Sequence, residues 1–326
     1  MITFWFSVVV LAWVLFFVLE GFDFGVGLLG PLLGRDDHER GAAVRTIGPF
    51  WDGNEVWLVG AIGVTFAAFP AWYSSLLSGL YLPMVVLLLL LAVRGVALEF
   101  RGKGDGERYR RRADWALGLS SLGIVLVWGA LLAVFAHGLA IGADGDVTGG
   151  GFARTLGPVF TPAAGFGALA ALYAALMLGA TFLSLRTSGP LRHRARTLAR
   201  WLGILGSGAL LAVGIGTGSP AVLVAAVLSF GASMLARLGR EALAFTATAA
   251  GVAAAVVAVF TTHGSVVLRS TLDPAWSLTR ESAAATPQAL ELITWAGAFI
   301  LPGVIAYQAF SYWVFRRRVA SERVPS

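Results

Sequence analysis

The stretch PMVVLLLLLAV, residues 83–93, contains no charged or hydrogen-bonding side chain. A second stretch, GVAAAVVAVF at residues 251–260, has the same character. Strands of a membrane barrel would alternate apolar and polar side chains over about ten residues. A helix on the surface of a soluble protein would keep one polar face. Stretches that are apolar all round therefore predict helices surrounded by lipid.

The composition of the whole chain supports the same conclusion. Of its 326 residues, 57% are hydrophobic and 13% are charged, with a mean hydropathy of +0.79. These values lie outside the range of soluble domains, so we predict an all-α integral membrane protein. A helix that spans the bilayer needs about 20 mostly apolar residues. We predict nine spans, at about 4–28, 47–69, 75–98, 115–136, 162–185, 200–217, 219–237, 241–262 and 289–315.

Basic residues are distributed unevenly over the loops that nine spans would leave. Twenty of the 24 Lys and Arg residues follow the first, third, fifth, seventh or ninth span. The alternate loops hold Arg154, Arg269 and Arg280, and Arg94 lies inside the third span. Cytoplasmic loops carry the excess of Lys and Arg in membrane proteins. The bias predicts an N-terminus outside the cell and a cytoplasmic C-terminus, and it supports nine spans.

The net charge of +6 comes from these basic loops. RGKGDGERYRRR (101–112) and RTSGPLRHRAR (186–196) are typical of solvated loops beside anionic lipid, so we expect no nucleic acid partner. The first residues lack a basic segment and a cleavage site, which favours a retained first helix over a signal peptide. Because the chain has no cysteine, disulfides, thiolate metal sites and covalently attached heme are excluded.

Charged side chains inside the predicted spans are few, and an ionised group there costs several kcal/mol unless it is paired or hydrated. They are Glu20 and Asp23 in the first span, Asp52 and Glu55 in the second, and Arg94 and Glu99 in the third. Acids three residues apart share one face of a helix. The predicted topology places all of these residues toward the cytoplasm, so we expect a polar cluster near the inner surface.

Two interpretations of this cluster stay open. The acids could lie among lipid headgroups and pair with arginines. Alternatively, with Trp57 and Asn54 beside them, they could form a proton relay or a cation site that opens to the cytoplasm. Small residues allow helices to approach closely, so Gly21, Gly25 and Gly27 could bring the acids into one pocket, although ordinary packing would use them equally well.

The histidines lie away from the middle of the predicted spans. His38 and His193 fall in cytoplasmic loops, and His137 and His263 lie at the outer ends of predicted helices. A heme between helices needs an axial ligand, usually His or Met, at membrane depth. We interpret the methionines at positions 84, 177 and 234 as packing residues. The chain is therefore predicted to bind no heme or metal and to perform no redox chemistry by itself.

Several motifs resemble those of one known family. They are LEGFDFGVGLL (19–29), TIGPFWDGNEVWLVGAIGVTFAAFPAWY (46–73), SGLYLP (78–83) and RGVALEFRGK (94–103), with weaker support from GATFLSLRT (179–187). Together they resemble subunit II of the cytochrome bd-type quinol oxidases. The dense part covers about residues 15–105.

The resemblance implies a partner and a reaction. Subunit II would form a heterodimer with a subunit I that carries b-type hemes and heme d. The complex would be a terminal oxidase of the respiratory chain that oxidises quinol, reduces oxygen to water and takes protons from the cytoplasm. This chain would be a multi-pass protein of the bacterial plasma membrane and not catalytic alone. The sequence leaves open whether the complex contains a small accessory subunit.

The resemblance also implies an architecture of two four-helix bundles plus one peripheral helix. We assign residues 1–136 to the first bundle, 137–262 to the second, and 263–326 to an outer loop and the peripheral ninth helix. Asp52 of the WDGN motif would contribute to the proton path toward heme d, and Glu99 would line its cytoplasmic mouth. Arg94 would tune the pKa values of both acids. The supporting residues would be Asp23, Glu20, Glu55, Trp57 and Asn54.

Two alternatives remain at this point. A proton-coupled secondary transporter would use the same acids, but it would place them near the midplane in both halves of the chain. A purely structural partner of subunit I would carry no protons. The residues also leave open whether ubiquinol or menaquinol is oxidised, whether a quinone or lipid fills this subunit, and how oxygen reaches heme d.

Overall fold

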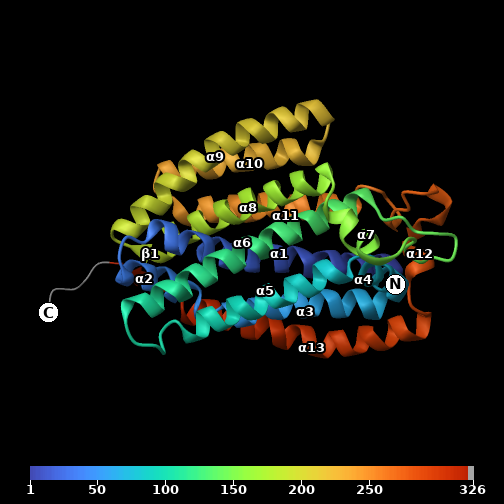
Figure 1. The fold of residues 1–326 in the computed structure, drawn as a ribbon, viewed down its shortest axis with the longest axis horizontal. Helices are drawn as coiled ribbons and strands as arrows, with labels where there is room; N and C mark the ends of the chain where they lie inside the picture. Colours follow the sequence, from blue (N-terminus) through green and yellow to red (C-terminus); the bar gives the residue numbers. More distant parts are fainter. Residues whose placement is uncertain (322–326) are drawn as a thin grey trace.

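The computed structural model describes residues 1–321, apart from the side chain of Ala153, and its long helices run side by side (Figure 1). In this part of the chain, eight helices are long and apolar enough to cross a membrane. They are α1 (Ile2–Leu33), α5 (Tyr81–Phe100), α6 (Glu107–His137), α8 (Pro162–Arg186), α9 (Pro190–Thr217), α10 (Pro220–Arg237), α11 (Glu241–Thr261) and α13 (Pro287–Val314). The prediction of an all-helical membrane protein is confirmed.

The segment predicted as the second span forms α3 (Trp51–Ala68), which is 18 residues long. It is not among the eight, because Asp52, Asn54 and Glu55 make its first turns polar and lower its mean hydropathy. It nevertheless packs along α1 and also contacts α13. The amphipathic α2 (Asp37–Ile47) precedes it, and the Asp36 side chain caps α2 by accepting a hydrogen bond from the Glu39 amide.

Three of the differences between helix boundaries and predicted spans have a reason in the sequence. The predicted span 75–98 is divided at Leu80 into α4 (Pro70–Gly79) and α5. Pro83 has no N–H group to donate to the carbonyl of Gly79, so the helix is interrupted at this point. α6 and α9 begin several residues before the predicted spans, since arginine is a good helix former and both segments are rich in it.

Short elements cover the two ends of the helices. They are α7 (Gly151–Leu156), η1 (Gly157–Val159), β2 (Val266–Leu268), η2 (Pro274–Trp276), β3 (Leu278–Thr279) and α12 (Arg280–Ala283) at one end, and β1 (Thr187–Ser188) and β4 (Val319–Ala320) at the other. β1 and β4 pair in parallel, and β2 and β3 pair antiparallel. The arginine-rich turn between α5 and α6 lies at the same end as α2 and β1, whereas the N-terminus lies at the opposite end (Figure 1). Arg323, counted above among the basic residues, lies outside the described residues.

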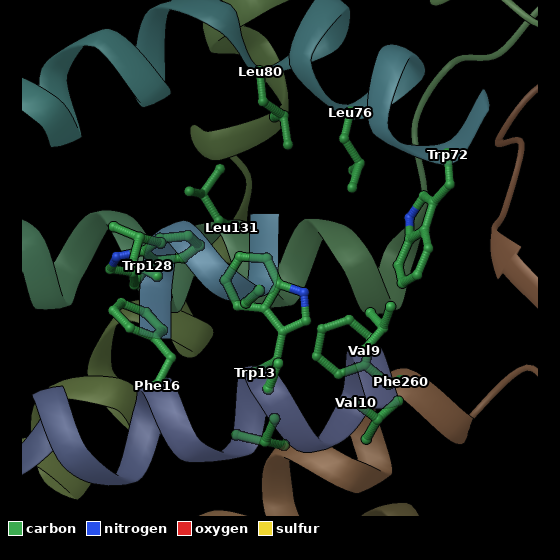
Figure 2. Packing of buried hydrophobic residues seen from close by; sticks show 14 of the residues in the cluster. Val9, Val10, Trp13, Phe16, Trp72, Leu76, Leu80, Trp128, Leu131 and Phe260 are labelled. Atoms are coloured by element: carbon green, nitrogen blue, oxygen red, sulfur yellow. The ribbon is translucent and has the colours of Figure 1, made fainter. Parts of the chain in front are cut away.

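Aromatic side chains form the core between α1, α6, α11 and α4 (Figure 2). The rings of Trp13 and Trp128 meet edge to face with centroids 5.3 Å apart, and Phe260 stacks on Trp13 at 6.3 Å. The Trp13 indole N–H donates a hydrogen bond to Thr65 Oγ1 at 3.3 Å. Large rings supply much buried apolar area at a low entropic cost, so this cluster joins α1 to helices from both halves of the chain.

Glycines allow α1 to lie directly against α8. A Cβ atom added to Gly25 would lie 2.0 Å from the carbonyl oxygen of Ala175, and one added to Gly179 would lie 2.3 Å from the carbonyl carbon of Gly25. A Cβ on Gly27 would lie 2.4 Å from Ser121 Oγ of α6. These close approaches involve α6 and α8, which carry none of the predicted site residues. The glycines therefore serve helix packing.

Candidate functional site

A fully buried ion pair joins α1 and α5 toward the basic end of the helices. Glu20 and Arg94 are both 0% exposed, and Arg94 Nη1 lies 3.3 Å from Glu20 Oε2. The Arg94 guanidinium also lies over the ring of Phe24, 4.8 Å from its centroid. A charge this deep requires a counter-charge, and the carboxylate together with the aromatic ring provides the compensation.

Asp23, one turn further along α1, accepts a hydrogen bond from a side chain of α3. It is 0% exposed, and its Oδ2 accepts a hydrogen bond of 2.7 Å from Asn54 Nδ2. Two donors from α13, Gln308 Nε2 and the Tyr312 hydroxyl, each approach Asn54 Oδ1 at 2.8 Å. The Tyr312 ring stacks on Phe50, with centroids 4.4 Å apart and planes 5° from parallel. Elements far apart in the sequence thus meet at one buried amide.

Several polar atoms of this cluster make no hydrogen bond with the residues that the structure describes. They are both carboxylate oxygens of Glu20, Oδ1 of Asp23, and all three guanidinium nitrogens of Arg94. Buried polar atoms are normally satisfied by protein or water. The interior between Glu20, Asp23 and Arg94 is therefore a polar site with free capacity to accept or donate hydrogen bonds, which is suited to water or protons.

The remaining predicted site residues lie around this buried centre. Glu55 and Trp57 of α3 are half-buried, and the Trp57 indole N–H has no hydrogen-bond partner in the described part of the chain. Asp52 is exposed. Glu99 is also exposed and forms an ion pair of 2.6 Å with Lys103. The structure thus brings Glu20, Asp23, Asn54 and Arg94 together in the interior and leaves Asp52 and Glu99 on the surface.

Gln308 and Tyr312 were missed in the sequence reasoning. Both lie in the last predicted span, more than 250 residues from Asn54 along the chain. A signal for one of them was present, since Gln308 is the one amide side chain in GVIAYQAFSYW (303–313), a stretch without charged residues. Polar residues within membrane helices usually face other helices and form hydrogen bonds there.

A network of ion pairs lies at the basic end. Asp114 of α6 is 2% exposed and lies 3.0 Å from Arg40 Nε and 2.5 Å from Arg101 Nε. Asp37 continues the network, with Arg101 at 2.8 Å and Arg110 at 2.7 Å. Burial, and then the positive charge of Arg101, lowers the pKa of Arg45. The network fixes α2 to the turn between α5 and α6 and to the beginning of α6. α2 itself ends shortly before the WDGN motif.

A second group of ion pairs at this end joins the later helices. Glu241 of α11 lies 2.5 Å from Arg192 of α9 and 3.6 Å from Arg318, which follows α13. Arg194 pairs with Glu39 of α2. The later helices and the segment after α13 are therefore connected electrostatically to each other and to α2.

An apolar cavity lies among the long helices. Its volume is about 290 Å³, and it lies between α1, α6, α8, α10 and α11 with Trp128, Tyr173 and Met177 among its lining residues and no histidine. His137 is the last residue of α6, and His263 follows α11, with His263 Nε2 2.6 Å from the Ala136 carbonyl oxygen. Residues 1–321 contain no group of three or more His, Asp or Glu side chains placed to bind a metal ion. Of the two usual axial ligands of heme, the lining of this cavity therefore includes a methionine but no histidine.

Comparisons with known proteins agree with the motifs. A family model described as cytochrome bd terminal oxidase subunit II matches residues 1–315. The chain is 35% identical over 330 residues to the cytochrome bd ubiquinol oxidase subunit 2 of Bacillus subtilis (strain 168), which covers 97% of this chain and 96% of the relative. It is 28% identical over 357 residues to the cytochrome bd-I ubiquinol oxidase subunit 2 of Escherichia coli (strain K12), covering 95% and 92% of the two chains.

A solved structure shares the fold. The bd oxidase from Geobacillus thermodenitrificans has a chain that matches with a TM-score of 0.68, covering 96% of this chain and 98% of that chain at 20% identity. The family expected from the LEGFDFGVGLL and WDGNEVW motifs is thereby confirmed. Since the family model extends over nearly the whole sequence and the Bacillus relative matches from end to end, this chain belongs to the cytochrome bd terminal oxidase subunit II family.

Proposed function

We propose that this chain, a multi-pass subunit II of a bacterial respiratory terminal oxidase, forms a heterodimer with a heme-bearing subunit I and supplies it with protons from the cytoplasm. The complex would oxidise quinol and reduce oxygen to water. The hemes of the partner would supply the redox chemistry. The contribution of this chain is to hold subunit I and to bind, orient and move protons.

The proposed topology includes α3 as a ninth span. α3 packs along α1 and contacts α13, so its position matches that of a membrane helix in spite of its polar first turns. The basic end, with α2, β1 and the α5–α6 turn, would face the cytoplasm and the N-terminus would lie outside. We keep the division into a first bundle (1–136), a second bundle (137–262) and a C-terminal part (263–326) as a proposal.

The buried cluster is the observation that carries the proton path. Glu20, Asp23 and Arg94 have no exposure, yet six of their polar atoms have no hydrogen-bond partner in the described chain. Buried ionisable groups with unmet hydrogen bonds are costly, and in membrane proteins they usually mark ion or proton routes. We propose that Glu99 collects protons at the surface and that this cluster receives them, while Arg94 limits the accumulation of negative charge.

Asp52 would act at the boundary with subunit I. It is exposed, and Val56 and Val59, four and seven residues further along α3, are 53% and 70% exposed. Residues at this spacing share one helix face, so Asp52 lies on an outward apolar face that a partner helix would cover. At that position it would pass protons toward heme d. The same position favours a second role, in which Asp52 anchors subunit I by accepting hydrogen bonds.

The test uses conservative substitutions in the purified two-subunit complex. Asp23→Asn, Asp52→Asn and Glu99→Gln each keep the shape of the side chain and remove its titrating group. With a proton path, turnover and proton uptake fall by at least about tenfold while the heme spectra stay intact. Asp105→Asn, in the exposed α5–α6 turn, is the matched control and keeps full turnover.

The heme spectra separate the two roles of Asp52. A loss of heme or of subunit I in Asp52→Asn, with normal turnover per remaining heme, would assign Asp52 to the interface. Unchanged turnover with intact hemes in all three variants would reject the proton path and leave the chain as a structural partner of subunit I.

A further inference from the structure

The Asn54 side chain lies between a carboxylate and two donors. Its Nδ2 is 2.7 Å from Asp23 Oδ2, and its Oδ1 is 2.8 Å from both Gln308 Nε2 and the Tyr312 hydroxyl. A primary amide donates through nitrogen and accepts through oxygen. Its orientation is therefore set by the partners at its two ends. An ionised Asp23 accepts only, so it requires the amide nitrogen, and in this orientation the amide oxygen accepts from both Gln308 and Tyr312.

The donors on α13 are themselves fixed in place. Asn54 is fully buried, and the Tyr312 ring is held flat against Phe50 at 4.4 Å. Gln308 lies one turn before Tyr312 on the same helix, so both donors approach Asn54 from one side. Rotation of the Asn54 amide would turn its nitrogen toward these two groups and its oxygen toward Asp23. The hydrogen bond to an ionised Asp23 would then be lost, and the two hydrogen bonds to α13 would persist only if the Gln308 amide also rotated and the Tyr312 hydroxyl became the acceptor.

We propose that Gln308 and Tyr312 are positioning residues that hold the Asn54 amide with its N–H group toward Asp23 and thereby keep Asp23 ionised until a proton is delivered. An ionised carboxylate only accepts hydrogen bonds, whereas a protonated one also donates. Asp23 that has gained a proton on Oδ2 is better matched to the reversed amide, whose oxygen would accept that O–H group. No covalent bond other than this O–H bond forms, and α13 thus senses the protonation of Asp23.

The other groups around Asp23 do not replace this control. The charged or titratable side chains that act on Asp23 are Glu20 of α1, Glu55 of α3, Arg94 of α5 and Tyr312 of α13. Arg94 favours the ionised form and the two glutamates oppose it. Substitutions on α13 leave Glu20, Glu55 and Arg94 in place, and Gln308→Leu also leaves Tyr312 in place, so a change in the proton occupancy of Asp23 in that variant would report the orientation of the amide.

The experiment measures the protonated Asp23 carboxyl directly in the purified complex. The infrared C=O stretch of a protonated carboxyl is followed against pH, and the contribution of Asp23 is the part that disappears in Asp23→Asn. The variants are Tyr312→Phe, Gln308→Leu and both together. The matched controls are Tyr307→Phe and Gln288→Leu, which change exposed residues of the same helix.

The double variant should keep the Asp23 band to higher pH than the unmodified complex, by about a tenfold change in proton concentration. Each single variant should give a smaller shift, and the controls none. Tyr312→Phe removes one oxygen atom and keeps the stack on Phe50, so it stays informative if the double variant assembles poorly. Equal bands in the variants and the unmodified complex, an equal shift in the controls, or no Asp23 band in any variant would overturn the proposal.

The contribution of Gln308 and Tyr312 to turnover rests on the proposed function. The infrared measurement tests their positioning of Asn54 independently of that function. Normal turnover in Asp23→Asn would reject the proton path through Asp23, yet the band of Asp23 would still move in the double variant if the amide is held as proposed. Conversely, impaired turnover in Asp23→Asn with an unmoved band would keep the path and reject the positioning role of α13.

Discussion

Replacing Arg94 with methionine would remove the only guanidinium of the buried cluster in the described chain while keeping most of its apolar volume. Glu20 would then lie in the interior without its partner, with Asp23 one turn away. The two atoms of the ion pair are 3.3 Å apart, which corresponds to an attraction of about 5 kcal/mol at an effective dielectric constant of about 20. Removal of one partner from a buried pair typically costs about 3–5 kcal/mol.

We therefore expect Arg94→Met to lower the free energy of unfolding by about 3 kcal/mol or more. Glu20→Gln combined with Arg94→Met should restore part of this loss, because the buried acid is then neutral. The assay is a double-mutant cycle on the purified complex, unfolded in mixed micelles with increasing SDS and followed by tryptophan fluorescence. The control is Lys103→Met, which breaks a pair whose side chains are both 55% exposed and should cost less than about 1 kcal/mol.

The double-mutant cycle can also refute the coupling between Arg94 and Glu20. If Arg94→Met destabilises the complex equally with Glu20 and with Gln at position 20, the two residues are not coupled. The ion pair would then contribute nothing to stability, and Glu20 would not depend on Arg94 as its counter-charge.

Two further predictions concern parts of the fold that position the site. Asp114→Asn leaves Arg40 and Arg101 without their buried counter-charge and should destabilise the complex by about 3 kcal/mol, measured by the same SDS unfolding assay. The control is Glu107→Gln, which should be nearly neutral because the Glu107 side chain is 71% exposed. Gly25→Ala places a methyl group 2.0 Å from the Ala175 carbonyl oxygen and should lower the unfolding free energy by about 1–3 kcal/mol; Gly208→Ala, with no atom within 4 Å, should not lower it, and equal stability of both variants would contradict the packing of α1 on α8.

The positions of the acids show which features of the site could be predicted from residue spacing and which could not. The i, i+3 spacing of Glu20 and Asp23 correctly placed both on one face of a helix, and their rarity in an apolar span marked them for attention. The pattern did not distinguish Asp52 from Asn54, two residues away in the WDGN motif. One is exposed and the other fully buried, because α1 and α13 cover only one side of α3.

The sequence by itself determined the membrane location, the all-helical class, the bias of basic loops toward one side and the family. These properties are sums over local composition or matches to contiguous motifs, so they need no knowledge of which helices touch. The tertiary structure alone decided that Arg94 pairs with Glu20, that Asn54 holds Asp23, and that Gln308 and Tyr312 complete the cluster from the last helix. These contacts join helices distant in the chain, and in lipid the choice of neighbours is made by close packing and interhelical hydrogen bonds, which hydropathy does not record.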